Sequence, residues 1–320
     1  RNNEKVLLAA YRSIARAVDE GRSITPAAEW VLDNYHVVEE QIREIREDLP
    51  PGFYRQLPKL AEGHFAGFPR VFGIAWAYVA HTDSRFDPET LRRFVRAYQT
   101  VEPLTIGELW AVAITLRIVL VENLRRVAQR IVTSRAARQE ADAIADRLLG
   151  VGGQTADPDA LIRRAPPGPL VAAFAVQLVH RLREQDPHVT PAVVWLEERL
   201  TKQGTSSEAL VREEHQRQGA SNVTVRNIIT SMRLMSDVDW AEFFESVSLV
   251  DEVLNASSSF AAMDFATRNL YRNAIEELGR GTRLSELQVA KQVLTTAASA
   301  KTPRERDPGY HLIADGRRRL

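Results

Sequence analysis

Apolar residues recur at helical spacing along nearly the whole 320-residue chain. After Thr25 they follow one another at intervals of three and four residues, so that one face of a helix collects them. The positions are Val31, Tyr35, Val38, Ile42, Ile45 and Leu49. No stretch alternates apolar and polar residues over the length of a strand, and the single β-rich run, 222–229, stands alone. Because a lone strand has no partner for its backbone hydrogen bonds, the pattern predicts an all-α protein.

The predicted helices share a way of starting, in which a capping residue is followed by proline. The side-chain oxygen of Thr or Asp accepts a free backbone N–H, and proline lacks the N–H that would go unpaired at the first helical position. The four pairs are Thr25–Pro26, Asp87–Pro88, Asp157–Pro158 and Thr190–Pro191. A fifth start, TIGE at 105–108, has the form of a capping box between Thr105 and Glu108.

The helix predicted after Thr105 is apolar nearly all round between Trp110 and Val121, which indicates a buried, central position. Beyond it the sequence turns more polar, and we expect the helix to break near Thr133.

Glycine and proline mark the best candidate boundary, GVGGQTADPD at 150–159. We therefore expect an irregular multi-helix bundle with one helical subdomain over 1–150 and a second over 151–300. No fixed period of about 34 or 40 residues indicates a regular helical repeat. Residues 301–320 are charged and contain Pro and Gly, and are predicted to be a linker toward a following domain.

Charge balance and residue types exclude several functional classes. The formal net charge is 0, and no basic stripe typical of a nucleic-acid-binding surface dominates. The absence of cysteine excludes disulfides, thiolate zinc sites and cysteine nucleophiles. The apolar runs 71–80 and 110–121 are shorter than the about 20 residues of a membrane helix. We expect no nucleic-acid partner, no membrane span, no metal site and no cofactor.

The stretch 65–87, FAGFPRVFGIAWAYVAHTDSRFD, is predicted to form a buried helix from near Pro69 to near His81, followed by a turn. His81 and Asp83 supply at most two of the three or four ligands that a metal needs. The polar residues at the ends of this stretch are the candidate binding residues, for a sugar or for a neighbouring domain. They are Arg70, His81, Asp83 and Arg85.

DVDW at 237–240 has the Asp-x-Asp form of metal-binding sugar-nucleotide transferases, but it lies between helical stretches rather than at the end of a strand. We therefore expect Asp237 or Asp239 to cap a helix. We predict no catalytic residue in this chain, because no complete signature occurs.

Two further patterns leave alternatives open. Acidic pairs, such as Glu213–Glu214, lie on polar helix faces, where solvated surface is the default, although glycoside-cleaving enzymes need two carboxylates several Å apart. Aromatic residues concentrate over 53–78 and can form either a core or the platforms of a carbohydrate site.

Six stretches, taken in order, together resemble the amino-terminal region of the cyclic β-1,2-glucan synthases. They are 25–50 (TPAAEWVLDNYHVVEEQIREIREDLP), 68–87 (FPRVFGIAWAYVAHTDSRFD), 103–128 (PLTIGELWAVAITLRIVLVENLRRVA), 239–254 (DWAEFFESVSLVDEVL), 260–278 (FAAMDFATRNLYRNAIEEL) and 307–318 (DPGYHLIADGRR). The resemblance implies a fragment of a large membrane protein that joins a glycosyltransferase domain, using UDP-glucose, to a region similar to glycoside phosphorylases. It also implies a protein-linked glucan intermediate, and whether a tyrosine such as Tyr310 receives the first glucose is left open.

The transferase signature of that family is missing here, since the chain contains no strand-borne metal motif and no Gln-x-x-Arg-Trp. The resemblance therefore predicts a non-catalytic accessory domain on the cytoplasmic side of the inner membrane. Its expected partner is the neighbouring transferase domain, with β-glucan as a candidate second partner. The alternatives are an α-helical carbohydrate-active enzyme domain with paired carboxylates and a helical protein-binding scaffold.

Overall fold

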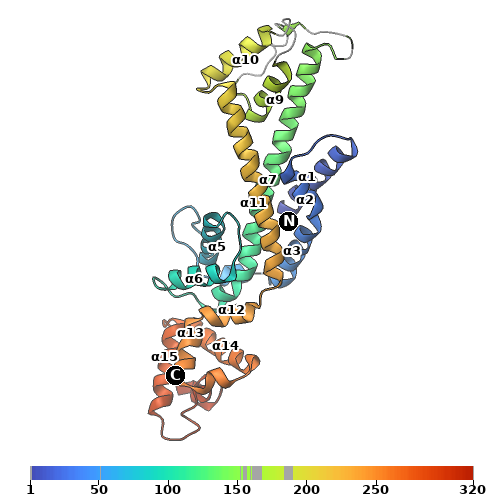
Figure 1. Ribbon diagram of the computed structural model, residues 1–320. Coiled ribbons are helices and arrows are strands. Elements are labelled where there is room, and N and C mark those ends of the chain that lie inside the picture. The colour runs from blue at the N-terminus through green and yellow to red at the C-terminus, as the bar shows by residue number, and fades with distance from the viewer. Residues whose placement is uncertain are drawn as a thin grey trace. The chain divides into compact units, whose positions relative to one another are not determined.

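A computed structural model describes the whole chain except residues 1, 51, 152, 154–156, 159, 161–167, 184–189 and 320 (Figure 1). Helices dominate the described part, which contains no β-strand beyond an isolated bridge between Lys59 and Pro69. The prediction of an all-α protein is confirmed. Across these residues, none of the helices has the length and hydrophobicity that crossing a membrane requires.

The chain divides into two compact units that are interleaved in the sequence. Unit 1 comprises residues 1–42 and 121–229, and unit 2 comprises residues 43–120 and 230–320. The divisions fall within three helices, which are α3 (Tyr35–Asp48), α7 (Ile106–Leu148) and α11 (Ser207–Ser236). Since each unit is built from two separate parts of the chain, neither is a continuous sequence segment.

Among the residues that the structure describes, unit 1 also contains helices that lie entirely within it. They are α1 (Asn2–Asp19), α2 (Pro26–Asp33), α9 (Ala172–Leu182) and α10 (Thr190–Lys202). One of its cores is formed where the last part of α7 packs with α9, α10 and the start of α11 through small and leucine side chains, among them Ala141, Ala145, Leu178 and Leu196. The expected break near Thr133 is wrong, since α7 continues through it as a single helix of 43 residues. The reason is tertiary packing, because the buried face of α7 continues past Thr133 and Ser134 to Ala141 and Ala145.

The remaining described helices belong to unit 2. They are α4 (Phe53–Gln56), α5 (Arg70–His81), α6 (Pro88–Gln99), α12 (Trp240–Val247), α13 (Leu249–Ser257), η2 (Ser259–Ala262), α14 (Phe265–Gly281), α15 (Glu286–Ser299), α16 (Pro308–Ile313) and η3 (Asp315–Arg319). The apolar start of α7 lies in this unit with Val112, Leu116 and Leu120 buried, as its sequence predicts. Trp110 of the same helix stacks on Phe244, with ring centroids 4.3 Å apart.

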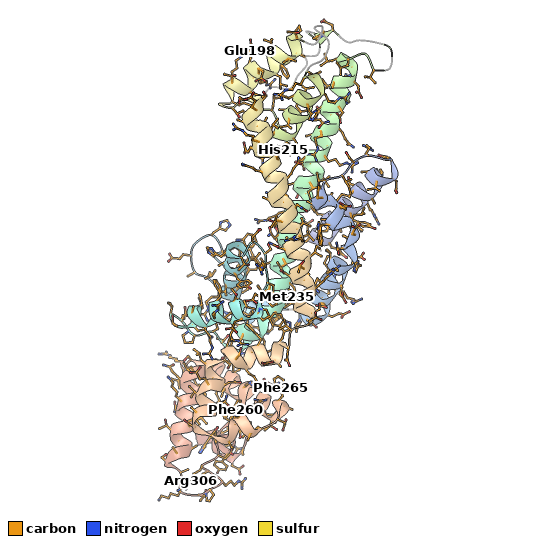
Figure 2. All side chains as sticks on the ribbon, in the orientation of Figure 1. Glu198, His215, Met235, Phe260, Phe265 and Arg306 are labelled. Atoms are coloured by element: carbon orange, nitrogen blue, oxygen red, sulfur yellow. The ribbon has the colours of Figure 1, made fainter. Side chains whose placement is uncertain are left out.

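Arg272 lies at the centre of a buried charge network in unit 2, with its side chain 1% exposed. It pairs with Asp251, which is buried to the same extent, and with Glu245 Oε1 at 2.8 Å. Its guanidinium also lies 4.9 to 5.7 Å from the ring centroids of Phe244, Phe265 and Phe260, the last two of which Figure 2 labels among the helices of this unit. Burial opposes its charge, yet the hydrogen bonds that it donates to the carboxylates of Asp251 and Glu245 outweigh burial and raise the pKa of Arg272.

The predicted helix starts are confirmed where the structure describes their caps. Thr25 accepts from Ala28 N at 3.3 Å and Asp87 accepts from Thr90 N at 2.8 Å, each before a proline. Glu108 N donates to Thr105 Oγ1 while Glu108 Oε2 accepts from Thr105 N, which completes the predicted capping box. Asp239 caps α12. Pro158 is helical but adjoins residues outside the described part, and α10 begins at Thr190 itself.

Residues 301–320, predicted to be a linker, include α16, which packs on α14 and α15. His311 and Leu312 of this helix are buried. Whether the segment leads to a following domain stays a prediction, as do the subdomain boundaries near residues 150 and 300.

Candidate functional site

The four candidate binding residues predicted from the sequence lie at opposite ends of one helix. Arg70 is the first residue of α5 and His81 the last, and twelve residues of helix separate the two ends by roughly 16 Å. Asp83 and Arg85 follow in the turn after His81, and these three residues are exposed. The structure therefore brings His81, Asp83 and Arg85 into one turn and places Arg70 apart from them.

Arg70 is buried in a dense ion-pair network. Its Nε and Nη2 donate to Glu108 Oε1 and Oε2 at 2.9 and 2.6 Å, and the Glu108 side chain has no exposed surface. Nη1 lies 2.6 Å from Glu102 Oε1, and Nη2 also donates to the carbonyl of Pro103 at 3.0 Å. The hydrogen bonds that Arg70 donates to the Glu108 carboxylate raise the pKa of Arg70, despite burial. Arg70 thus joins α5 to the start of α7, and little of its surface is accessible to a ligand.

The turn after α5 is held by backbone and hydroxyl contacts. Asp83 and Ser84 both adopt the left-handed conformation, at φ 47° and 63°. Ser231 Oγ donates to the carbonyl of Ser84 at 2.7 Å and accepts from Phe86 N at 2.8 Å. The turn is therefore hydrogen-bonded to Ser231, which lies in the part of α11 that belongs to unit 2.

Four aromatic side chains gather beside this helix and form what we call the aromatic cluster: Phe65, Phe68, Phe72 and Trp76. Ring centroids of its neighbouring members lie 5.1 to 6.2 Å apart. Phe68 is 49% exposed and the other three are half-buried. Of the aromatic residues predicted to gather here, Tyr78 lies in the core instead.

A cavity of about 240 Å³ in unit 2 brings two carboxylates to the start of α7. Glu286 Oε2 accepts from Ile106 N at 2.6 Å, and Glu276 Oε1 accepts from Arg280 Nη2 at 2.7 Å. Burial raises the pKa of the Glu286 carboxyl to about 7, with a further contribution from Glu276 and a partial offset from Ile106 N. The two carboxylates therefore differ in environment, since one is paired with a cation and the other is largely desolvated.

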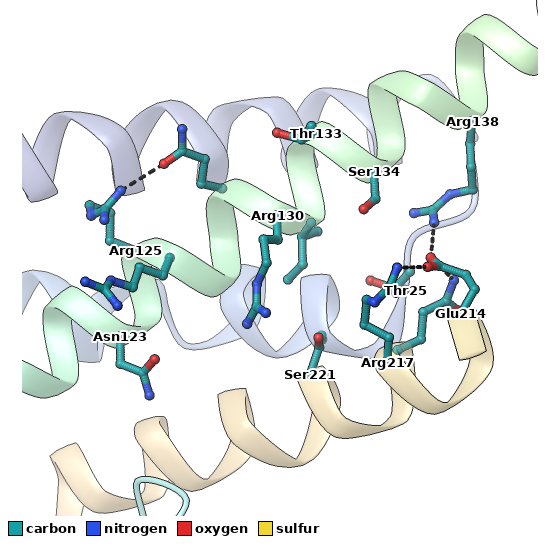
Figure 3. Close-up of a pocket in the computed structure, with 15 residues that line it drawn as sticks. Thr25, Asn123, Arg125, Arg130, Thr133, Ser134, Arg138, Glu214, Arg217 and Ser221 are labelled. Atoms are coloured by element: carbon teal, nitrogen blue, oxygen red, sulfur yellow. Dashed lines mark hydrogen bonds and ion pairs between the residues drawn. The ribbon is translucent and has the colours of Figure 1, made fainter. Parts of the chain in front are cut away.

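A larger cleft, of about 750 Å³, lies in unit 1 between α7, α11 and the first turn of α2 (Figure 3). We call it the arginine cleft, because five of its lining residues are arginines and one is acidic. They are Arg125, Arg126, Arg130, Arg138, Arg217 and Glu214. Amide and hydroxyl side chains line the space between them, including Asn123 and Ser221.

The carboxylates at the arginine cleft are shared between arginines. Glu122 accepts from both Arg125 and Arg126, at 2.7 and 2.9 Å. Glu214 lies 3.5 Å from Arg138 and accepts from Arg217 at 3.1 Å. Among the residues that the structure describes, no carboxylate pairs with Arg130. Its side chain extends from α7 toward Ser221 on α11 (Figure 3).

One sequence signal for this cleft lies in the spacing of two of its arginines. Arg126 and Arg130 are four residues apart on one helix, where like charges repel each other and destabilise the helix. Within the described residues, no group of three or more His, Asp or Glu side chains could hold a metal ion.

Comparison with known proteins gives one clear relationship. No family model matches the chain. The curated cyclic beta-(1,2)-glucan synthase NdvB of Rhizobium meliloti (strain 1021) is 43% identical to it over 304 residues. The match covers 94% of this chain and 11% of that relative, so the chain spans a small part of the relative's length.

Proposed function

Since this chain is homologous to part of a cyclic β-1,2-glucan synthase, we propose that it is a non-catalytic accessory domain of such an enzyme. The observation that carries the proposal is the 43% identity over 94% of the chain, which bears out the resemblance seen in its six ordered stretches. In this proposal the domain packs on the glycosyltransferase domain that uses UDP-glucose, or guides the growing glucan, on the cytoplasmic side of the inner membrane.

The internal chemistry of unit 2 supports a scaffolding role. Its buried charged groups are engaged with one another, as in the pairs of Arg70 with Glu108 and Arg272 with Asp251. Such pairs fix the relative positions of helices rather than leaving a charged group free for a substrate. Contacts to glucan or to the transferase domain would then come from exposed side chains, for which His81, Asp83 and Arg85 remain our candidates.

The test is to delete residues 1–300 from the full-length synthase and to assay initiation, elongation, cyclisation and membrane expression separately. We expect a loss in assembly or in glucan handling, while the transferase retains its ability to hydrolyse or transfer from UDP-glucose. Polymerisation or cleavage of glucan by the 320-residue chain alone would contradict the proposal.

A second candidate function, a carbohydrate-active enzyme domain, is favoured by the cavity at Glu286. A carboxyl with a pKa of about 7 beside the Glu276 carboxylate, which accepts a hydrogen bond from Arg280, has the pattern of the paired carboxyl groups of a glycoside-cleaving enzyme. Its test is the Glu286→Gln variant, which would abolish any glucan-cleaving activity of this chain while Glu277→Gln, an exposed change on α14, would leave it intact.

A further inference from the structure

The arginine cleft of unit 1 has no part in the proposed accessory role, and its lining points to a particular ligand chemistry. We propose that it binds a phosphate-bearing ligand, most directly through a diphosphate group. The proposal goes beyond the accessory function and does not rest on it.

Positive side chains outnumber negative ones at the arginine cleft. The five arginines of the cleft meet three carboxylates, of Glu122, Glu213 and Glu214, and the first and last of these are each shared between two arginines. An arginine has five N–H donors, so sharing a carboxylate leaves donors available to an additional anion. Arg130, exposed on the cleft and without a partner among the described residues, is the residue best placed to bind it.

Neighbouring groups make the same region electropositive. The arginines that line the cleft come from both α7 and α11. The first turn of α2 also lines the cleft through Thr25 and Ala27, and the amino-terminal end of a helix carries partial positive charge. Three elements of unit 1 therefore favour an anion in the same space.

The lining also decides between an anion and a neutral sugar. Carbohydrate sites commonly present aromatic faces, yet none of the described residues that line the arginine cleft is aromatic. Guanidinium forks match the oxygens of phosphate in a bidentate manner. Arg126 and Arg130 are separated by about 6 Å of helix rise, which lets both reach neighbouring phosphate groups of one diphosphate.

The experiment is a calorimetric titration of the 320-residue chain with inorganic pyrophosphate, with a nucleoside diphosphate, and with a neutral β-1,2-linked glucan oligosaccharide. We expect one saturable site for pyrophosphate that weakens as salt is raised. If the nucleoside diphosphate binds as tightly as pyrophosphate, the cleft recognises the phosphates alone. If it binds more tightly, the nucleoside makes additional contacts. Either result supports the proposal. Binding of the neutral oligosaccharide in this cleft, or no saturable binding of either phosphate ligand, would overturn it.

Variants identify the site. Arg130→Gln should weaken pyrophosphate binding about tenfold, and the pair Arg126→Gln with Arg130→Gln about a hundredfold, given the strength of charge-assisted hydrogen bonds. Arg130→Lys should fall between wild type and Arg130→Gln, since it keeps the charge but not the fork. The matched control is Arg147→Gln, an exposed arginine of the same helix that does not line the cleft and whose Nε donates to the carbonyl of Ala143 at 3.2 Å. An equal effect of the control and of Arg130→Gln would show nonspecific attraction and reject the site.

Discussion

Arginine is used in opposite ways in the two units. In unit 2, Arg70 and Arg272 are buried, and each is matched to a carboxylate that is itself buried, Glu108 or Asp251. In unit 1, the arginines of the arginine cleft are half-buried or exposed and share their carboxylates, and Arg130 has none in the described part of the chain. The same side chain therefore serves helix packing in one region and leaves unsatisfied charge in the other.

Burial distinguishes a structural arginine from a candidate ligand-binding arginine. A buried arginine must be paired, because a desolvated charge without a partner costs several kcal/mol. An exposed arginine carries no such requirement, so an excess of exposed arginines in a cleft adds little to stability and is better explained by a ligand. Stability measurements should consequently respond strongly to changes in unit 2 and weakly to changes in the arginine cleft.

The largest effect is expected from Arg272→Ala. The change leaves Asp251 buried without its cation and removes the packing of the guanidinium on Phe244, so we expect the free energy of unfolding to fall by about 3–5 kcal/mol. Urea denaturation followed by circular dichroism measures it. Arg280→Ala on the same helix is the control, because that side chain is 60% exposed and should cost less than about 0.5 kcal/mol. Similar losses for both variants would remove the distinction between buried and exposed pairs.

Glu286 is a half-buried carboxyl whose hydrogen bond comes from a backbone N–H, that of Ile106. Burial raises its pKa to about 7 in the folded chain, above the usual value of 4.5. Between pH 4.5 and 7 the folded chain therefore keeps a proton that the unfolded chain releases, and stability falls as the pH rises through this window. The loss should amount to about 3 kcal/mol.

The measurement compares unfolding of wild type and Glu286→Gln at pH 5 and pH 8. Glutamine keeps an acceptor for Ile106 N and does not titrate, so the variant should lose this part of the pH dependence. Glu252→Gln, at a 60% exposed position, should keep it. Identical pH profiles for wild type and Glu286→Gln would show that burial does not shift this carboxyl.

Arg70→Lys tests whether the fork itself matters in unit 2. Lysine keeps the charge next to Glu108 but cannot donate to both of its oxygens and to Pro103 in one plane. We expect a loss of about 2 kcal/mol, close to the worth of one charged hydrogen bond. Arg96→Lys is the control in the same unit, since that side chain is 49% exposed. An unchanged unfolding midpoint for Arg70→Lys would show that the pair stabilises the fold through its charge alone.

Local chemistry made much of the fold predictable, and distance along the chain limited the rest. The caps at Thr25, Asp87 and Asp239 depend on residues two or three positions away, so they could be recognised in the sequence. The capping role of Glu108 was likewise predictable, whereas its pairing with Arg70, 38 residues away, was not. The arginine cleft combines α7 with α11, and only the spacing of Arg126 and Arg130 hinted at it. The continuation of α7 past Thr133 depended on packing against α9 and α10, which periodicity alone does not reveal.

The smallest effect on stability is expected where we expect the largest effect on binding, at Arg130. Because this side chain is exposed and has no partner in the described part of the chain, Arg130→Gln should change the free energy of unfolding by less than about 0.5 kcal/mol. Removing the charge can even stabilise α7 slightly, since it relieves the repulsion from Arg126 one turn earlier. Urea denaturation at low salt measures the difference, and it should vanish at high salt, where screening removes the repulsion. A loss of several kcal/mol would place Arg130 with Arg70 and Arg272 among the structural arginines, and the contrast between the two units would no longer hold.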